Sequence, residues 1–213
     1  MRKAKMLLTQ IHRDLDDVLE QIIDHQQIVG MWQLESEWGP RALGNRSILF
    51  DPRHKDAKNI VNSVKKRESY RPFACTVMLE HAETYFDMEQ LPESPWMSFA
   101  LQCKPRALRD IPRLVHADNT CRIQTVTGEQ NANYYNLIKG FYERTGVPII
   151  FNTSFNLGGE SIVETVEDAI DTCNRSMINH LYIPEDQDVY IPYDSVRDKT
   201  KYLPKEDEEK DTA

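Results

Sequence analysis

A short apolar run between two helical patterns constrains the fold of this chain most strongly. Residues 131–146 (NANYYNLIKGFYERTG) place apolar side chains on one helix face, and Gly146 suits the left-handed residue that ends a helix. The segment 147–155 (VPIIFNTSF) then predicts a buried strand. Residues 165–175 (TVEDAIDTCNR) predict a second helix, in which Thr165 and Asp168 resemble a capping box. A buried strand between helices is typical of a sheet covered by helices.

The rest of the chain continues this alternation of helices and strands. Further helices are predicted within residues 14–30, with Asp14 as N-cap, and over 57–65. Strands are predicted at 28–32, 47–50, 71–79, 96–103, 120–126 and 180–183. We therefore expect an α/β (α+β) fold with a twisted mixed sheet flanked by helices, in a single domain over residues 1–193. The charged segment 194–213 is expected to be a disordered tail.

Charge and cysteine content exclude several classes of function. The net charge of −8 argues against direct nucleic-acid binding and against binding to an anionic membrane, since both need a positive face. No run approaches ~18 apolar residues and no signal peptide is recognisable, so we expect no membrane span and a cytoplasmic protein. The four cysteines form no CxxC pair, which favours reduced, mostly buried thiols over a zinc site.

An arginine-rich loop, residues 36–53 (SEWGPRALGNRSILFDPR), stands out in this acidic chain. Its Gly-Pro and Gly-Asn pairs favour tight turns, which can expose backbone N–H groups to an anion. Arg41 and Arg46 add guanidinium groups that suit phosphate or carboxylate. The alternative is that both arginines pair with nearby acids such as Glu35 and Glu37 and only fix the loop.

A second cationic segment follows at residues 64–73 (VKKRESYRPF). If the chain is extended there, Lys65 and Arg67 point to the same side and can bind one polyanion together. The alternative is a solvated helix end, because cations are favoured in the last helical turn.

A polar segment, residues 151–161 (FNTSFNLGGES), leaves the buried strand and ends in a glycine pair. On an extended strand Asn152, Ser154 and Asn156 lie on the same face. Gly158 and Gly159 permit close approach of the backbone to a ligand. Polar groups at the end of a buried strand are a common ligand site in α/β proteins. The alternative is a polar turn with local side-chain caps.

Taken together, Lys65-x-Arg67 and Ser154-x-Asn156 resemble the nucleotide-binding signature of YrdC-like domains, which use ATP to make a carbamoyl-type adenylate. Longer strings are similar to the C-terminal, YrdC-like domain of the O-carbamoyltransferase family, which includes nodulation-factor and antibiotic carbamoyltransferases. These strings are EWGPRALGNRSIL, VKKRESYRPFA, TCRIQTV and GVPIIFNTSFNLGGESIVETVEDAI. The resemblance runs in order from about residue 18 to about residue 183.

The resemblance implies an adenylate-forming half-reaction, in which carbamoyl phosphate and ATP, with Mg²⁺, give carbamoyl-adenylate and pyrophosphate. A separate actin-like domain or subunit, which holds its own metal, would transfer the carbamoyl group to an acceptor hydroxyl. Lys65 and Arg67 would meet the phosphates and the carbamoyl group, and Arg122 the carbamoyl phosphate or the α-phosphate. Ser154 and Asn156 would hold the phosphate and ribose side, with Asn152 beside them. Arg41 and Arg46 would be further phosphate contacts, and no metal site on this chain is expected.

The chain departs from the family pattern at a few positions. Leu34 and Glu35 stand where the family tends to have Gly-Arg, and Asn119 replaces a usual glycine after His116. An acid in place of an arginine lowers the local positive charge. This difference favours one alternative function, a non-catalytic nucleotide-binding scaffold for the actin-like subunit. A second alternative, a threonylcarbamoyl-adenylate synthase, also stays open.

Overall fold

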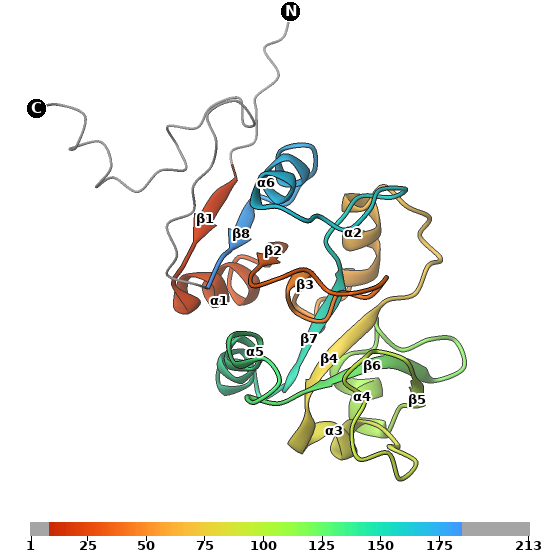
Figure 1. The fold of residues 1–213 in the computed structure, drawn as a ribbon. Coiled ribbons are helices and arrows are strands. Elements are labelled where there is room, and N and C mark those ends of the chain that lie inside the picture. The colour runs from red at the N-terminus through yellow and green to blue at the C-terminus, as the bar shows by residue number, and fades with distance from the viewer. Residues whose placement is uncertain (1–8, 185–213) are drawn as a thin grey trace, which may run out of the picture.

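The computed structural model describes residues 9–184, which form a single eight-stranded sheet with helices on its faces (Figure 1). The strand order is β1-β8-β2-β3-β7-β4-β6-β5. The strands are β1 (Gln10–His12), β2 (Val29–Trp32), β3 (Arg46–Phe50), β4 (Ala74–Met78), β5 (Ala100–Gln102), β6 (Thr120–Val126), β7 (Ile149–Ser154) and β8 (His180–Tyr182). The helices are α1 (Leu15–Ile23), α2 (Ala57–Val64), α3 (Leu79–Tyr85), α4 (Pro105–Asp110), α5 (Ala132–Thr145) and α6 (Val166–Asn174).

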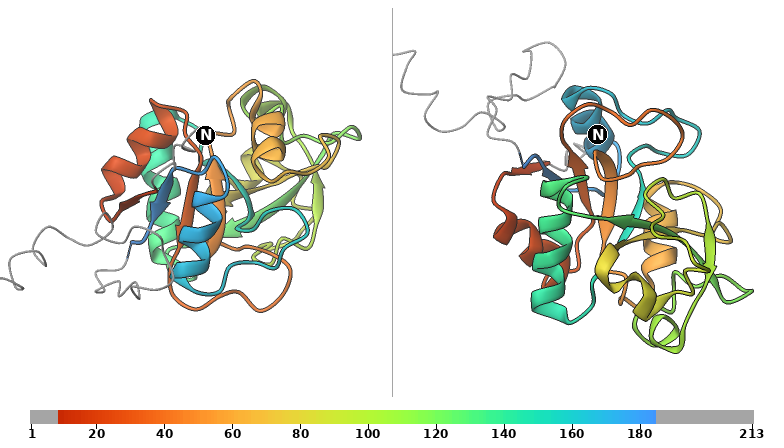
Figure 2. Two further views of the ribbon diagram at one scale, coloured as in Figure 1. Left: turned by 90° about the horizontal axis from the view of Figure 1, so that it is seen from above. Right: turned by 60° about the horizontal axis from the view of Figure 1, so that its bottom comes forward.

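The sheet is mixed, as the alternation of elements predicts. β7 is antiparallel to both of its neighbours, β3 and β4, whereas β4 runs parallel to β6. Helices α1 and α5 lie together on one face, and α6 covers the other face near β2 and β8 (Figure 2). The expected α/β fold class is therefore confirmed.

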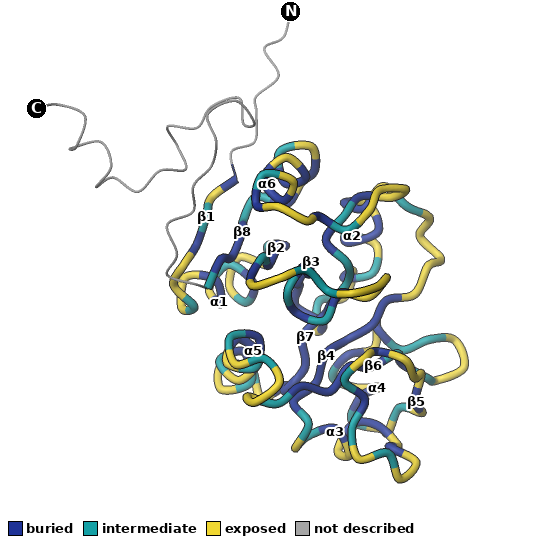
Figure 3. The backbone as a smooth tube through the Cα atoms, in the orientation of Figure 1, coloured by how far each residue is buried: buried dark blue, intermediate teal, exposed yellow. Residues whose placement is uncertain are grey.

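The core lies along the central strands, which are buried over most of their length (Figure 3). All residues of β3 and β4 are buried, and so are the first four residues of β7. The apolar faces of α1 and α5 pack on this sheet, and Gly140 lets the two helices approach, since a Cβ there would lie 2.6 Å from Leu19 Cδ1. Removal of this apolar surface from water is the main force that holds the sheet and helices together.

The predicted helix ends are confirmed. The Asp14 carboxylate accepts from the backbone N–H of Asp16 at the start of α1. Thr165 and Asp168 form the reciprocal capping box of α6, and Gly146 ends α5 in the left-handed region with φ +75°. These groups satisfy backbone donors and acceptors that helix ends otherwise leave unpaired.

Three elements were not anticipated from the sequence. They are β1, α3 and α4, which have 3, 7 and 6 residues. The strand predicted over 96–103 is also reduced to three residues, Ala100–Gln102. Periods of two or 3.6 residues cannot be recognised in segments this short, and their structure depends on tertiary packing.

Two further expectations meet the structure in part. Cys75, Cys121 and Cys173 are buried free thiols, whereas Cys103 is only partly buried. In residues 9–184, no helix combines the length and the apolar character needed to cross a membrane. The charged segment 194–213, expected to be disordered, lies outside the described residues.

Candidate functional site

Two adjoining cavities lie where the central strands end. The first, here called the lysine cavity, has a volume of about 280 Å³ and is lined by residues that include Lys65, Arg67, Ser154, Asn156 and Gly158. The second, here called the arginine cavity, has a volume of about 120 Å³. Its lining includes Arg41, Arg67, Arg122, Asn152 and Ser154. Because Arg67 and Ser154 line both cavities, the two form one continuous cationic site.

The turn after α2 brings Lys65 and Arg67 to this site, but not by the predicted geometry. Lys65 is the C-cap of α2 with helical backbone angles, and Lys66 is left-handed with φ +52°. The expectation of an extended segment with alternating side chains is therefore wrong. The chain reverses at Lys66, and this reversal places both cations on one cavity.

Lys65 is buried, with 3% of its surface exposed, and it extends to the end of β7. Its Nζ donates to the Ser154 carbonyl oxygen at 2.5 Å, to Ser154 Oγ at 3.1 Å and to Asn156 Oδ1 at 2.8 Å. All three acceptors are neutral. Burial, and then repulsion by Arg67, lower the pKa of Lys65 to about 7. The alternative of a solvated helix end does not hold for this residue.

Arg67 is held by neutral partners as well. Its Nε donates to Asn62 Oδ1 at 2.6 Å, and its guanidinium carbon lies 4.0 Å from the centre of the Phe73 ring. Burial and the nearby charge of Arg71 lower the pKa of Arg67 to about 10. Asn62 and Phe73 were not recognised from the sequence as supports of the site, since contacts of this kind depend on the folded packing.

Arg41 and Arg122 complete the cluster from two other elements. Arg41 lies on the loop between β2 and β3, and Arg122 is the third residue of β6. Burial, and then the charge of Arg122, lower the pKa of Arg41, so the two guanidinium groups repel each other. Within residues 9–184 neither side chain donates a hydrogen bond to another group. Uncompensated cations around a small cavity attract a polyanion.

Asn152 is a buried residue in the lining of the arginine cavity. It is fully buried, and its Nδ2 donates to the Ala42 carbonyl oxygen and to Thr76 Oγ1, both at 3.1 Å. The Ala42 carbonyl can only accept, so it fixes the orientation of the amide. Asn152 Oδ1 has no hydrogen-bond partner among the described residues. A buried acceptor without a partner is costly, and it indicates a site for a donor group.

Ser154 and Asn156 lie at and just beyond the end of β7. Ser154 Oγ donates to Asn156 Oδ1 at 2.7 Å, and Asn156 Nδ2 donates to the Glu160 carbonyl oxygen at 2.6 Å. Asn156 therefore belongs to the following turn rather than to the strand face predicted for it. The glycine pair lies beside it, and the Gly158 N–H donates to the Lys65 carbonyl oxygen at 2.7 Å.

Arg46 is not brought to the cationic cluster. This residue is 2% exposed, and it donates to the carbonyl oxygens of Gln33 and Leu34 at 2.6 and 3.0 Å. Its guanidinium also lies 4.3 Å from the centre of the Trp32 ring. A phosphate role for Arg46 therefore has no geometric support, because its side chain ties β3 to the preceding loop instead.

Glu37 fixes the arginine-rich loop through backbone groups. Its carboxylate accepts from the backbone N–H groups of Leu43, Asn45 and Arg46 at 2.7 to 3.1 Å. Glu37 thus ties the loop down, as the alternative expected of a nearby acid, and it does so through backbone N–H groups. This arrangement leaves the Arg41 side chain available at the arginine cavity.

His116 lines the arginine cavity and is held by two polar contacts. Its ring nitrogens lie 3.1 Å from Thr120 Oγ1 and 3.3 Å from the Phe73 carbonyl oxygen. Asn119, which replaces a usual glycine, adopts φ +60°, a conformation that asparagine tolerates better than most residues.

A larger cavity of about 800 Å³ lies elsewhere, over β2 and the start of α6. Its lining includes the acids Glu35, Glu37, Glu164 and Glu167. Size alone would favour this cavity, but its acidic lining would repel a phosphate. The chemistry therefore points to the smaller cationic pair of cavities.

The chain is similar to several known proteins. A family model described as Carbamoyltransferase C-terminus matches residues 20–187. The chain is 42% identical over 162 residues to the nodulation protein NolO of Bradyrhizobium diazoefficiens, covering 74% of this chain and 30% of that protein. It is 46% identical over 147 residues to the nodulation protein NolNO of Sinorhizobium fredii, covering 68% of this chain and 22% of that protein.

A third relative carries a chemical name. The chain is 30% identical over 156 residues to a 3'-hydroxymethylcephem-O-carbamoyltransferase of Streptomyces clavuligerus, covering 73% of this chain and 28% of that protein. The chain thus spans less than a third of the length of these curated relatives.

Solved structures share the fold at low sequence identity. HypF in a phosphate- and nucleotide-bound form has a TM-score of 0.53 and 18% identity, and the match covers 78% of this chain and 20% of HypF. A variant of P. abyssi Sua5 has a TM-score of 0.54 and 12% identity, and the match covers 83% of this chain and 49% of Sua5. These likenesses confirm the YrdC/Sua5-like fold expected from the sequence.

Proposed function

Because the chain belongs to the carbamoyltransferase C-terminus family, we propose that it activates a carbamoyl group by forming carbamoyl-adenylate from carbamoyl phosphate and ATP. The family membership supports a carbamoyltransferase, and the cationic site supports the adenylate-forming step. In this proposal the chain supplies the activated group, and the remainder of a longer enzyme or a separate subunit transfers it.

The reaction would proceed in two balanced steps. Water first cleaves carbamoyl phosphate to carbamate and inorganic phosphate. A carbamate oxygen then attacks the α-phosphorus of ATP, the bond to the β-phosphate oxygen breaks, and pyrophosphate leaves. Since carbamate is already an anion, this attack needs no general base. Positioning and charge stabilisation are the main contributions left to the protein.

The observation that carries the proposal is the pairing of cations with an unpartnered acceptor. Carbamoyl phosphate has an anionic phosphate and a neutral amino group that can only donate to its surroundings. Arg41, Arg67 and Arg122 suit the phosphate. The amino group would donate to Asn152, which lines the same cavity and whose buried Oδ1 has no partner among the described residues. An acyl phosphate without this amino group would leave the Asn152 acceptor unpaired.

The lysine cavity would hold the nucleotide phosphates. Lys65 offers a point charge there, and the glycine pair Gly158 and Gly159 leaves room for a phosphate against the backbone. Among the described residues, no group of three acidic, histidine or cysteine side chains could hold a metal ion. Mg²⁺ would therefore enter as the complex with ATP, bound by the phosphates and by water.

The carbamoyl acceptor is a hydroxyl group in this proposal. The name of the cephem relative describes transfer to a hydroxymethyl oxygen in that protein. The relatives are more than three times as long as the region they share with this chain, so transfer can take place outside that region. The proposed site of transfer is the actin-like domain or subunit that the sequence resemblance implies.

Pyrophosphate release tests the proposal. The purified chain, with Mg²⁺ and ATP, should release pyrophosphate when carbamoyl phosphate is added and much less with acetyl phosphate. Lys65→Met should abolish this release without unfolding the chain. Release with threonine and bicarbonate, but not with carbamoyl phosphate, would favour a threonylcarbamoyl-adenylate synthase instead.

A non-catalytic nucleotide-binding scaffold is the second candidate, and Glu35, which stands where the family tends to have an arginine, favours it. A scaffold would bind ATP in calorimetry but release no pyrophosphate, even when the remainder of such an enzyme is added as a second polypeptide.

A further inference from the structure

We propose that Arg175 is a positioning residue that holds the glycine turn of the lysine cavity, residues 156–160, in place through Glu160. This inference rests on the proposed function, because it assigns Arg175 a role in nucleotide binding by the same site. Arg175 lies outside the lining of both cavities, so it would act through its neighbours rather than by touching substrate.

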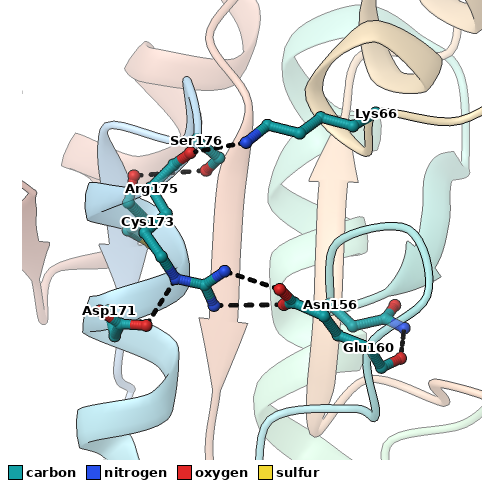
Figure 4. A network of polar contacts seen from close by, with 7 residues as sticks. All are labelled: Lys66, Asn156, Glu160, Asp171, Cys173, Arg175 and Ser176. Carbon is teal, nitrogen blue, oxygen red and sulfur yellow. Dashed lines mark hydrogen bonds and ion pairs between the residues drawn. The ribbon is translucent and has the colours of Figure 1, made fainter.

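Arg175 connects the end of α6 to the turn that follows β7 (Figure 4). Its Nη1 donates to Glu160 Oε1 at 2.6 Å and its Nη2 to Glu160 Oε2 at 3.2 Å, which is a bidentate pair. Its Nε donates to Asp171 Oδ2 at 2.6 Å, one turn earlier on α6. A bidentate pair fixes the orientation of the carboxylate as well as its distance.

The path from Glu160 to Lys65 takes only two further contacts. The Glu160 carbonyl oxygen accepts from Asn156 Nδ2 at 2.6 Å, and Asn156 Oδ1 accepts from Lys65 Nζ at 2.8 Å. Movement of Glu160 would therefore turn the Asn156 amide, and this amide supplies one of the three acceptors of the buried Lys65 ammonium.

A second set of contacts joins the same segments through the backbone. The Gly158 N–H donates to the Lys65 carbonyl oxygen at 2.7 Å, and Lys66 Nζ lies 3.4 Å from the Arg175 carbonyl oxygen. The glycine turn is thus attached to the turn after α2 by the Gly158 N–H and to the end of α6 by the Arg175–Glu160 pair, which Figure 4 shows. Gly158 and Gly159 line the lysine cavity, so the shape of that cavity depends on both attachments.

The exposure of the ion pair separates this role from a general stabilising one. The side chains of Arg175 and Glu160 are 43% and 39% exposed, and exposed pairs contribute little to global stability. We therefore expect loss of the pair to loosen the turn and to leave the fold intact. Asp171, the other carboxylate partner of Arg175, offers a matched control, because it lies on α6 and does not contact the turn.

The test compares Arg175→Gln and Glu160→Gln with the control Asp171→Asn in the full chain. Amide hydrogen exchange at Gly158 should be at least about tenfold faster in the first two variants and unchanged in the control, because its acceptor Lys65 would move away. The KM for Mg·ATP should rise about five- to twentyfold, while kcat changes less than about threefold. Arg175→Lys should give intermediate values, since a lysine keeps the charge but not the bidentate geometry.

The outcomes distinguish this inference from the proposed function. If the unaltered chain neither binds ATP nor releases pyrophosphate, the proposed function fails, whatever the exchange at Gly158. If the unaltered chain binds ATP and Arg175→Gln matches Asp171→Asn in both Gly158 exchange and KM, Arg175 has no positioning role.

Discussion

Lys65 has an environment that makes its charge depend on pH in the physiological range. It is buried against neutral acceptors, and its pKa is lowered to about 7. Below this pH the ammonium is charged and can attract phosphate, and above it the neutral amine cannot. A bound phosphate would raise the pKa again, because it stabilises the charged form.

We therefore predict that kcat/KM for ATP is constant below pH 7 and falls about tenfold per unit well above it, because this parameter reports ionisation in the free protein. The rate at saturating ATP should depend on pH much less. Pyrophosphate release measured from pH 5.5 to 9 provides the test. Lys65→Met should lose at least about 100-fold in kcat/KM. The control Lys139→Met changes an exposed lysine and should retain the pH profile of the parent chain. A flat pH profile in the parent chain would contradict the role of Lys65 in ATP binding.

Gly158 is the residue at which the site can be disturbed most locally. A Cβ at Gly158 would lie 2.9 Å from the Lys65 carbonyl oxygen and 3.1 Å from that of Lys66, so the two turns would have to separate. We expect Gly158→Ala to weaken ATP binding about tenfold while the melting temperature changes by only a few degrees. Gly128→Ala is the matched control, since its Cβ would lie 3.6 Å from the nearest atom. Calorimetric titration measures the affinity of both variants for ATP. Equal affinities of Gly158→Ala and Gly128→Ala would show that the two turns do not form the ATP site.

Residue types in the sequence indicated the chemistry of the site but not every member. Arg41 and Arg46 belong to one loop, and local sequence gave no reason to separate them. The register of β3 separates them, since Arg46 pairs with Trp32 of β2 and is enclosed, whereas Arg41 lies before the strand. Likewise, the sequence could not predict that Asn152 Oδ1 lacks a partner. The amide orientation is fixed only in the folded protein, where Ala42, Thr76 and Gln124 supply acceptors for Asn152 Nδ2.

Among the elements, long periodic segments were predictable and short ones were not. Apolar periodicity and capping residues in the sequence predict α1, α5 and α6, and a run of apolar residues predicts β7. The strand β1 has three residues and is defined by its parallel pairing with β8, more than 160 residues later. The turn after α2 was misassigned because Lys66 adopts a left-handed conformation that its residue type does not favour.

The pairing of β1 with β8 contains a pair of histidines that should make stability depend on pH. His12 Nε2 lies 2.8 Å from His180 Nδ1, and both pKa values are lowered, that of His180 to about 4, chiefly by burial. Asp17 opposes the shift at His12. The folded protein keeps His180 neutral where the unfolded chain would bind a proton. The free energy of unfolding is therefore highest above the unfolded pKa of 6.5 and falls as the pH drops toward 4.

We predict a loss of up to about 3 kcal/mol from this pair between pH 7 and pH 4. Urea unfolding at both pH values should show a smaller loss for His180→Asn than for the parent chain, because the asparagine does not titrate. His81→Asn, which leaves the β1–β8 pair intact, should keep the full loss. An unchanged loss in His180→Asn would mean that other groups carry the acid sensitivity.

At the scale of the whole molecule, an acidic protein presents a cationic site assembled from four separate parts of the chain. The loop before β3, the turn after α2, the third residue of β6 and the end of β7 meet because β7 lies between β3 and β4, with β6 next to β4. The net charge of −8 would repel ATP at long range, whereas Arg41, Arg67 and Arg122 would attract it at short range. These two effects respond to salt with opposite signs.

If the local cluster dominates, added salt screens its attraction and weakens binding; if the net charge dominates, salt screens repulsion and strengthens binding. We predict the first result, with the Kd for ATP rising about tenfold between 50 and 500 mM KCl at constant free Mg²⁺. Arg122→Gln should bind more weakly at low salt and depend less on salt, because it removes a charge that no described residue neutralises. Calorimetric titrations at several salt concentrations decide between the two signs. Tighter binding at high salt would show that the net charge, and not the arginine cluster, dominates the electrostatics of ATP binding.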